Sequence, residues 1–188
     1  TASDDGTARL WNAETGEPVG DPMQHDALVH DASFSPDGRR VVTASLDACA
    51  RVWSAETAEP LGGPLRHQDN WVMSASFSPD NKHILTLTGS LVAYVWDATT
   101  TETPARLLDS GAGMATAAIS SNGQWVATGN HGHAHPSGVK IFDTATQERG
   151  AQNIVHSGGV WSVCFSPDSR YLATAGVDGK ARVWDVAA

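Results

Sequence analysis

The chain has 188 residues, a formal net charge of -9 and only 12 lysines and arginines. Because affinity for nucleic acid and for anionic membranes depends largely on neutralising phosphates, this acidic chain without basic clusters is expected to bind neither. No apolar run is long enough to cross a bilayer, so the sequence predicts no transmembrane helix.

A pattern of about 43 residues recurs along the whole chain. One aromatic marker returns after 42, 43, 46 and 42 residues, at Trp11, Trp53, Trp96, Phe142 and Trp184. A second marker returns after 43, 42 and 46 residues, at Phe34, Phe77, Ile119 and Phe165. Because a repeat of this size cannot bury its own apolar faces, successive repeats must pack against one another.

The two markers divide the chain into repeats, of which the first and the last are incomplete. The divisions fall at residues 1–24, 25–66, 67–109, 110–155 and 156–188. The fourth repeat, 110–155, is degenerate and carries an inserted loop, because Thr128 and Phe142 are 14 residues apart where other repeats have 10.

In chain order, the first repeat is expected to open inside a second strand at residues 1–3 and to end in a linker at Gly16–Pro22. The second repeat predicts four short strands, at Val29–Phe34, Val41–Ser45, Ala50–Trp53 and Pro60–Leu65. Its first turn, Ser35–Gly38, has proline at the second position and glycine at the fourth, which is typical of a type I turn.

Four short strands per repeat and no helical periodicity predict an all-β fold. Four-stranded antiparallel sheets that cover each other's faces are the blades of a β-propeller. We therefore predict an open partial β-propeller of about four to five blades. Because both incomplete repeats would supply the same strands, we expect an arc of a longer propeller, about seven blades when complete, whose remaining blades are partners of this chain.

The repeats resemble those of the WD-repeat family, and the resemblance covers all 188 residues. In that family a His, a Ser or Thr, an Asp and a Trp at fixed places form a buried hydrogen-bonded tetrad. The resemblance implies complete tetrads at His25, Thr43, Asp47 and Trp53 and at His156, Thr174, Asp178 and Trp184, and a partial one at Thr1, Asp5 and Trp11.

The third and fourth repeats depart from the tetrad pattern. The third has Ser90 where the resemblance implies Asp. The fourth has Thr128 but neither the His nor the Asp, and Phe142 stands in place of Trp. An unpaired buried polar group costs about 1–3 kcal/mol, so we predict that these two repeats are less rigid.

The sequence lacks the motifs of common active sites, such as the Gly–x–Ser–x–Gly elbow and the phosphate-binding glycine loops. A His, Asp and Thr that recur in several repeats are interpreted as part of the fold, so we predict no enzyme and no cofactor. One alternative is a metal-binding or enzymatic site at the inserted loop, where His131, His133 and His135 alternate. The other interpretation of those histidines is a polar surface loop.

In the resembling family, partners commonly bind a loop face, formed by the loops before the first strand and between the second and third strands. Those loops carry Leu28, His30, Leu46, Trp71, Met73, Trp161 and Val177. Trp71 and Trp161 are expected either to anchor a partner or to lie flat over a neighbouring blade. The leading hypothesis is a non-catalytic scaffold that binds a protein or peptide on this face.

The wider setting is inferred from the linkers and the cysteines. The regular linkers resemble those of prokaryotic multidomain signalling proteins, so we expect a segment of a larger signalling protein. Cys49, in a predicted turn, and Cys164, predicted as a buried strand residue, make no disulfide framework and suit the reducing cytoplasm. A purely architectural array that oligomerises remains a further alternative.

Overall fold

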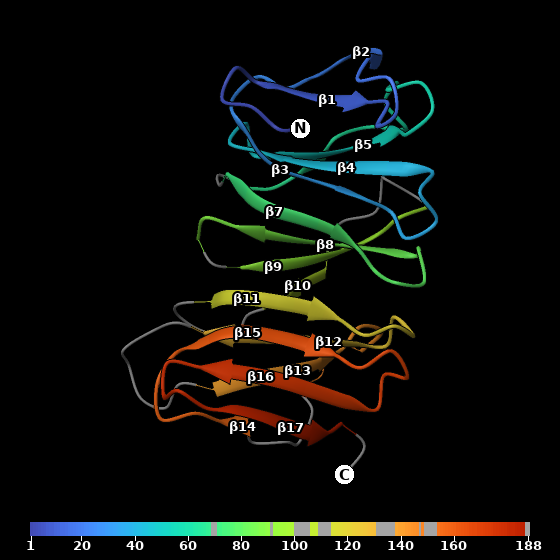
Figure 1. Ribbon diagram of the computed structural model, residues 1–188. Helices are drawn as coiled ribbons and strands as arrows, with labels where there is room; N and C mark the ends of the chain where they lie inside the picture. Colours follow the sequence, from blue (N-terminus) through green and yellow to red (C-terminus); the bar gives the residue numbers. More distant parts are fainter. Residues whose placement is uncertain are drawn as a thin grey trace. The chain divides into compact units, whose positions relative to one another are not determined.

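The computed structural model describes residues 1–68, 71–90, 92–99, 106–108, 114–130, 138–146, 148 and 154–186. Every regular element among these residues is a β-strand, and the strands form small antiparallel sheets (Figure 1). The chain divides into two compact units. The first comprises Thr1–Phe77, Asn81–Ser90 and Trp96–Ala105, and the second comprises Ser78–Asp80, Leu91–Val95 and Arg106–Ala188.

The first three sheets follow one another along the chain. The first sheet contains β1 (Thr7–Trp11) and β2 (Pro18–Gln24). The second contains, in spatial order, β3 (Val29–Phe34), β4 (Arg40–Ser45), β5 (Cys49–Ser54) and β6 (Leu65–Arg66). The third contains, in spatial order, β7 (Val72–Phe77), β8 (His83–Thr88), β9 (Ala93–Asp97) and β10 (Arg106–Leu108).

In the last two sheets, strands also follow one another in chain order, four in the fourth sheet and three in the fifth. The fourth contains β11 (Met114–Ile119), β12 (Trp125–Asn130), β13 (Gly138–Asp143) and β14 (Ile154–Val155). The fifth contains β15 (Val160–Phe165), β16 (Tyr171–Gly176) and β17 (Ala181–Asp185). In every sheet, strands that are consecutive in the chain pair antiparallel, which confirms the predicted all-β fold of blade-like sheets.

The first strands of the second to fifth sheets, β3, β7, β11 and β15, are here called the inner strands, and the turn after each of them contains one residue in the left-handed region of backbone space. Its φ is +71° at Gly38 and Gly123, +62° at Asn81 and +61° at Ser169. Only glycine adopts this conformation without strain, so the two other residues need compensation. Asn81 Oδ1 accepts a hydrogen bond from the Asp37 N–H at 3.3 Å, and Ser169 Oγ accepts one from the Asn122 N–H at 3.0 Å. The side chains of Asn81 and Ser169 therefore join their own turns to the turn of the preceding sheet.

Within the first compact unit, polar side chains also link the second sheet to residues around β7, β8 and the end of β9. Arg40 donates to the carbonyl oxygens of Asn81 and Ala98, both at 2.8 Å, and its guanidinium lies 4.7 Å from the centre of the Phe77 ring. Asp31 accepts from Ser74 Oγ at 2.9 Å. These contacts run from side chain to the next sheet, while the backbone ladders stay within each sheet.

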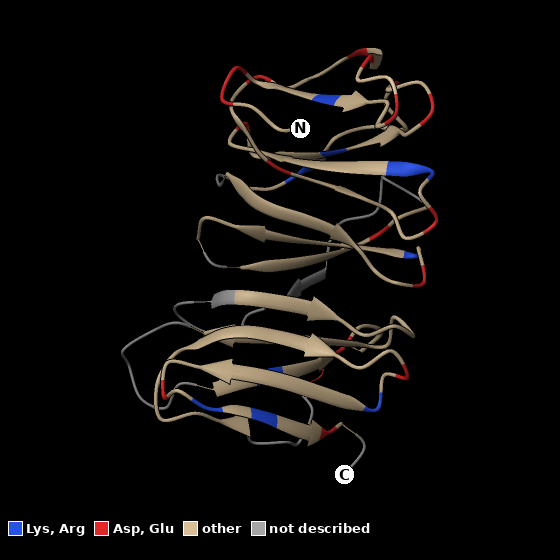
Figure 2. Cartoon of the chain, in the orientation of Figure 1, with Lys and Arg blue, Asp and Glu red and all other residues tan. Residues whose placement is uncertain are grey.

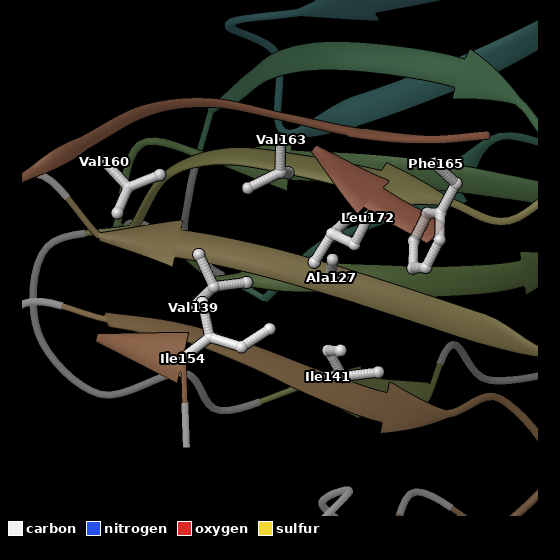
Figure 3. Packing of buried hydrophobic residues seen from close by; sticks show 8 residues of the cluster. All are labelled: Ala127, Val139, Ile141, Ile154, Val160, Val163, Phe165 and Leu172. Atoms are coloured by element: carbon white, nitrogen blue, oxygen red, sulfur yellow. The ribbon is translucent and has the colours of Figure 1, made fainter. Parts of the chain in front are cut away.

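Apolar side chains fill the space between sheets. In the second compact unit, β15 packs against β11 and β12, and one buried cluster joins the fourth and fifth sheets (Figure 3). Its members are Ala127, Val139, Ile141, Ile154, Val160, Val163, Phe165 and Leu172. Burying a large apolar side chain contributes about 1.5–3 kcal/mol, so face-to-face packing between sheets is the main source of stability.

Several details differ from the sequence predictions. The expected linker at Gly16–Pro22 is largely strand, because β2 lies at the outer edge of its sheet, where prolines are tolerated. The expected strand at residues 1–3 is reduced to a single bridge between Ala2 and Ala8. The expected fourth strand at Pro60–Leu65 shrinks to β6 and a bridge from Pro60 to Trp53.

The two cysteines are also placed differently from the expectation. Cys49 is buried and begins β5 instead of lying in a turn, whereas Cys164 on β15 is exposed. None of the described residues belongs to a helix long and apolar enough to cross a lipid bilayer.

Candidate interaction face and its polar supports

The second sheet brings together all four members of its predicted tetrad. Thr43 Oγ1, on β4, lies 2.7 Å from His25 Nε2 and accepts a 2.8 Å hydrogen bond from Trp53 Nε1. His25 Nδ1 lies 2.9 Å from Asp47 Oδ2. His25, Thr43 and Trp53 are buried, and the Asp47 side chain is only 5% exposed. These hydrogen bonds thus satisfy polar groups that burial has removed from solvent.

Arg51 joins this tetrad, although the family resemblance did not imply it. Its Nη1 atom contacts both Asp47 Oδ2 and His25 Nδ1. Burial raises the pKa of Asp47, but hydrogen bonds from Arg51 and His25 outweigh burial and bring that pKa to about 2. Burial lowers the pKa of His25, which favours the neutral imidazole in the folded state.

The fifth sheet repeats this arrangement. Thr174 Oγ1 lies 2.8 Å from His156 Nε2 and accepts a 3.0 Å bond from Trp184 Nε1. Asp178 lies 3.2 Å from His156 Nδ1 and accepts a 2.9 Å bond from Arg182. Burial raises the pKa of Asp178, but the bonds from His156 and Arg182 outweigh it, so the net shift is downward.

A sequence signal for these arginines does exist. An arginine follows the tetrad aspartate by four residues in three repeats, as the pairs Asp5 and Arg9, Asp47 and Arg51, and Asp178 and Arg182. In the third repeat both members change together, to Ser90 and Tyr94. The spacing within the repeated Ala–Arg–Val–Trp motif could therefore have identified the fifth member.

The partial tetrad of the first sheet stays open to solvent. Trp11 Nε1 donates to Thr1 Oγ1 at 3.1 Å, but the Trp11 side chain is 47% exposed. The Asp5 carboxylate accepts from the N–H and the hydroxyl of Thr7 at 2.9 and 2.7 Å. These residues satisfy each other locally and do not form a buried chain.

The third sheet keeps three of the four tetrad residues. Thr86 Oγ1 lies 2.8 Å from His67 Nε2 and accepts a 2.9 Å bond from Trp96 Nε1. Ser90, which stands in place of the aspartate, bonds to Thr88 at 3.0 Å. Burial lowers the pKa of His67 to about 4, because it outweighs the backbone hydrogen bonds with Ala48 and Leu65 that favour the charged imidazole.

The fourth sheet lacks the hydrogen-bonded tetrad. Thr128 is 1% exposed, and its hydroxyl finds no hydrogen-bond partner within the described part of the chain. Phe142, which is buried at the tryptophan position, has no N–H to donate. The sheet nevertheless forms with the same strand order, so the tetrad is not required for the fold of a blade.

The inner strands β3, β7, β11 and β15 carry a β-bulge at the same place. Strand pairing skips one residue, and the skipped residues are His30, Met73, Ala115 and Trp161. A bulge re-aims the side chain of the extra residue. His30 is exposed and Trp161 is 60% exposed, so at these two positions the bulge presents a side chain to solvent.

A second recurrent feature holds the predicted loop-face residues. The N–H before each aspartate-type position donates to the carbonyl oxygen of a residue that precedes the inner strand. The bonds join Leu46 to Leu28 at 2.9 Å, Gly89 to Trp71 at 2.9 Å and Val177 to Gly159 at 2.7 Å. In each of these three sheets, a backbone hydrogen bond therefore joins the loop before the first strand to the turn between the second and third strands.

In the first compact unit the face combines apolar side chains of different exposure. Trp71 is 52% and Leu46 38% exposed, while Leu28 and Met73 are half-buried. Trp71 lies over its own β8–β9 turn, because a Cβ on Gly89 would fall within 1.4 Å of the indole nitrogen. Trp71 thus contacts its own sheet, and about half of its surface stays exposed.

In the second compact unit, the predicted partner-binding residues are Trp161 and Val177. They are 60% and 52% exposed. Each faces solvent from a rigid position, Trp161 from the β15 bulge and Val177 from the turn bonded to Gly159.

The described residues form no cluster of metal ligands. No three His, Cys, Asp or Glu side chains there come together as a metal ion requires. The alternative ligands His131, His133 and His135 lie outside the described residues.

These blades, with their His–Thr–Asp–Trp sets, are those of a WD-repeat protein. The family described as "WD domain, G-beta repeat" matches residues 16–54, 61–97 and 151–185, which together make up more than half of the chain. The chain belongs to this family, whose members are generally interaction scaffolds without catalytic activity. The degenerate fourth repeat lies largely between the matched segments.

Two similar proteins share one name. The periodic tryptophan protein 2 homolog of Mus musculus is 29% identical over 72 residues, which are 38% of this chain and 8% of that protein. The homolog of Dictyostelium discoideum is 29% identical over 76 residues, which are 40% of this chain and 8% of that protein. The chain therefore matches less than a tenth of the length of either relative.

Proposed function

We propose that this chain is a non-catalytic scaffold that binds a protein or peptide on its loop face. The observation that carries the proposal is the recurrent bulge of the inner strands, which places His30 and Trp161 at the surface. Exposed aromatic side chains on a rigid support are typical anchors of protein interfaces, because little entropy is lost when they bind.

The charge distribution supports a protein ligand over a nucleic acid or an anionic membrane. In the view of Figure 2, lysines and arginines are scattered along the chain, and acidic residues lie mostly in turns. With a net charge of -9, the chain would repel a phosphate backbone. As part of the same proposal, the chain serves a larger cytoplasmic signalling protein, which rests on the regularity of its repeats and linkers.

A further blade of the same kind is the second partner in this proposal. In the second sheet, Val42 and Val52 are buried, and β7 packs against both β4 and β5. At the equivalent places of the fifth sheet, Ala173 is exposed and Val183 is 71% exposed. Because the repeats are equivalent, the surface complementary to this open face is the inner strand of another blade.

Affinity capture with the immobilised chain tests the loop-face proposal. The Trp71→Ala/Trp161→Ala double variant is expected to recover at least tenfold less partner than the wild type. Leu61→Ala is the control, because Leu61 is 41% exposed but belongs to a linker outside the loop face. Equal recovery by the double variant, with an unchanged thermal transition, would contradict binding on this face.

A further inference from the structure

A groove of about 400 Å³ lies on the first compact unit, between β2 and the segment that follows β5. Trp53, Pro22 and Pro60 supply apolar surface to it, and Asp21 and Glu59 supply two carboxylates. Trp53 lies near the end of β5 farthest from the Leu46 turn. The groove is thus at the opposite end of the second sheet from the loop face.

The backbone around the groove has a fixed shape. Gly20 has φ +66°, and a Cβ there would lie 2.2 Å from the Thr57 carbonyl oxygen, so β2 passes directly over this turn. Ala58 occupies the left-handed region, with φ +60°, where the first repeat has Gly16. A close approach that only glycine permits, beside a strained alanine, holds the two walls at one separation.

Among the described residues, the negative charge of the groove has no positive counterpart. No lysine or arginine among the described residues pairs with Asp21 or Glu59, and none lines the groove. Within the described part of the chain, the Glu59 carboxylate accepts a 3.4 Å hydrogen bond from the Thr57 hydroxyl. The second linker has Gly63 where the first has Asp21, so this carboxylate is not a requirement of the repeat.

We propose that the groove binds an arginine side chain from a partner protein. An arginine has an apolar stem, which matches the surface of Trp53, Pro22 and Pro60, and a charged head, which matches two carboxylates. Its planar fork of donors can bond Asp21 and Glu59 together, and the Gln24 amide oxygen in the same groove is a further acceptor. This site adds a contact at the opposite end of the second sheet to the loop-face binding proposed above.

The test is an NMR titration of the full 188-residue chain with the blocked tripeptide acetyl-Ala-Arg-Ala-amide. Saturable shifts are expected at the Gly20 amide and the Trp53 indole N–H. The same peptide with citrulline, which keeps the shape but loses the charge, is expected to bind at least tenfold more weakly, as is a norleucine peptide. A lysine peptide is expected to bind with intermediate affinity, because its ammonium cannot bond both carboxylates in one plane.

Matched variants locate the effect. Asp21→Asn/Glu59→Gln is expected to weaken arginine binding at least tenfold, and Glu56→Gln, an exposed carboxylate in the same turn outside the groove, less than twofold. Unchanged spectra of the double variant without peptide would show that its fold is intact. Equal affinity for the arginine and citrulline peptides, full binding by the double variant, or no saturable shift at Gly20 would overturn the proposal. None of these outcomes bears on the loop face.

Discussion

The second and fourth sheets have the same strand order but differ in their buried polar groups. In the second, Thr43 lies between His25 and Trp53 at 2.7 and 2.8 Å. In the fourth, Thr128 is equally buried but finds no partner among the described residues. Apolar strands and turns are therefore sufficient to make a blade, and we predict that the tetrad adds rigidity to a sheet that forms without it.

The largest effect is expected from Asp47→Ala in the second sheet. The substitution leaves Arg51 and His25 without their carboxylate in a covered site, which costs about 3 kcal/mol of the free energy of unfolding. Urea denaturation measures this loss. Asp37→Ala, which removes an exposed turn carboxylate, is the control and should cost about 1 kcal/mol or less. A similar loss for both variants would remove the special role of the tetrad.

A pH effect of similar size is expected from the third sheet. The folded-state pKa of His67, about 4, lies below the ordinary value of 6.5, so the unfolded chain binds the proton first. The stability that comes from keeping His67 neutral is fully present above pH 6.5. The free energy of unfolding falls by up to about 3 kcal/mol as the pH falls towards 4. NMR titration of the His67 ring measures this pKa directly. A value near 6.5 would refute the assignment, and His67→Gln should flatten the dependence in this window.

Two identical substitutions sharpen the comparison between the second and fourth sheets. Thr43→Val removes the partner of two buried groups and should cost about 2 kcal/mol. Thr128→Val replaces an unpaired hydroxyl by a methyl group of the same shape and should be neutral or stabilising by about 1 kcal/mol. Thermal unfolding of both variants measures these changes in stability. Equal losses of stability would mean that the Thr128 hydroxyl has a hydrogen-bond partner.

The smallest effect concerns the turn of the fifth sheet. Ser169→Ala keeps the strained φ of +61° and loses the bond to Asn122, so it should cost about 1 kcal/mol. Ser169→Gly loses the same bond but relieves the strain, so its net effect should be close to zero. If the glycine variant were the less stable of the two, strain at this turn would be unimportant.

The fold was predictable because the repeat fixes both the register and the turns. Positions such as His25 and Trp53 recur at constant offsets, so chemistry seen in one repeat identifies its equivalents in the others. The bulge at His30 was not predictable, because it depends on pairing between strands and leaves no mark in the residue types.

Other features were missed because their sequence signals are ambiguous. The prolines at 18 and 22 indicated a linker, but an outer edge strand does not need every N–H, so β2 forms there. Arg51 was visible in the repeated motif, yet only the folded turn shows that its guanidinium reaches Asp47 and His25. The groove beside Trp53 joins segments far apart in the sequence and needs the coordinates.

Native-state hydrogen exchange of the backbone amides tests the central claim most directly, because it reports the stability of each sheet separately. The amides of β4 and β5 and of β16, which carry complete tetrads, are predicted to exchange more slowly than those of β12 and β13 in the fourth sheet. Equal protection of all these strands would show that the polar sets do not make one blade more rigid than another.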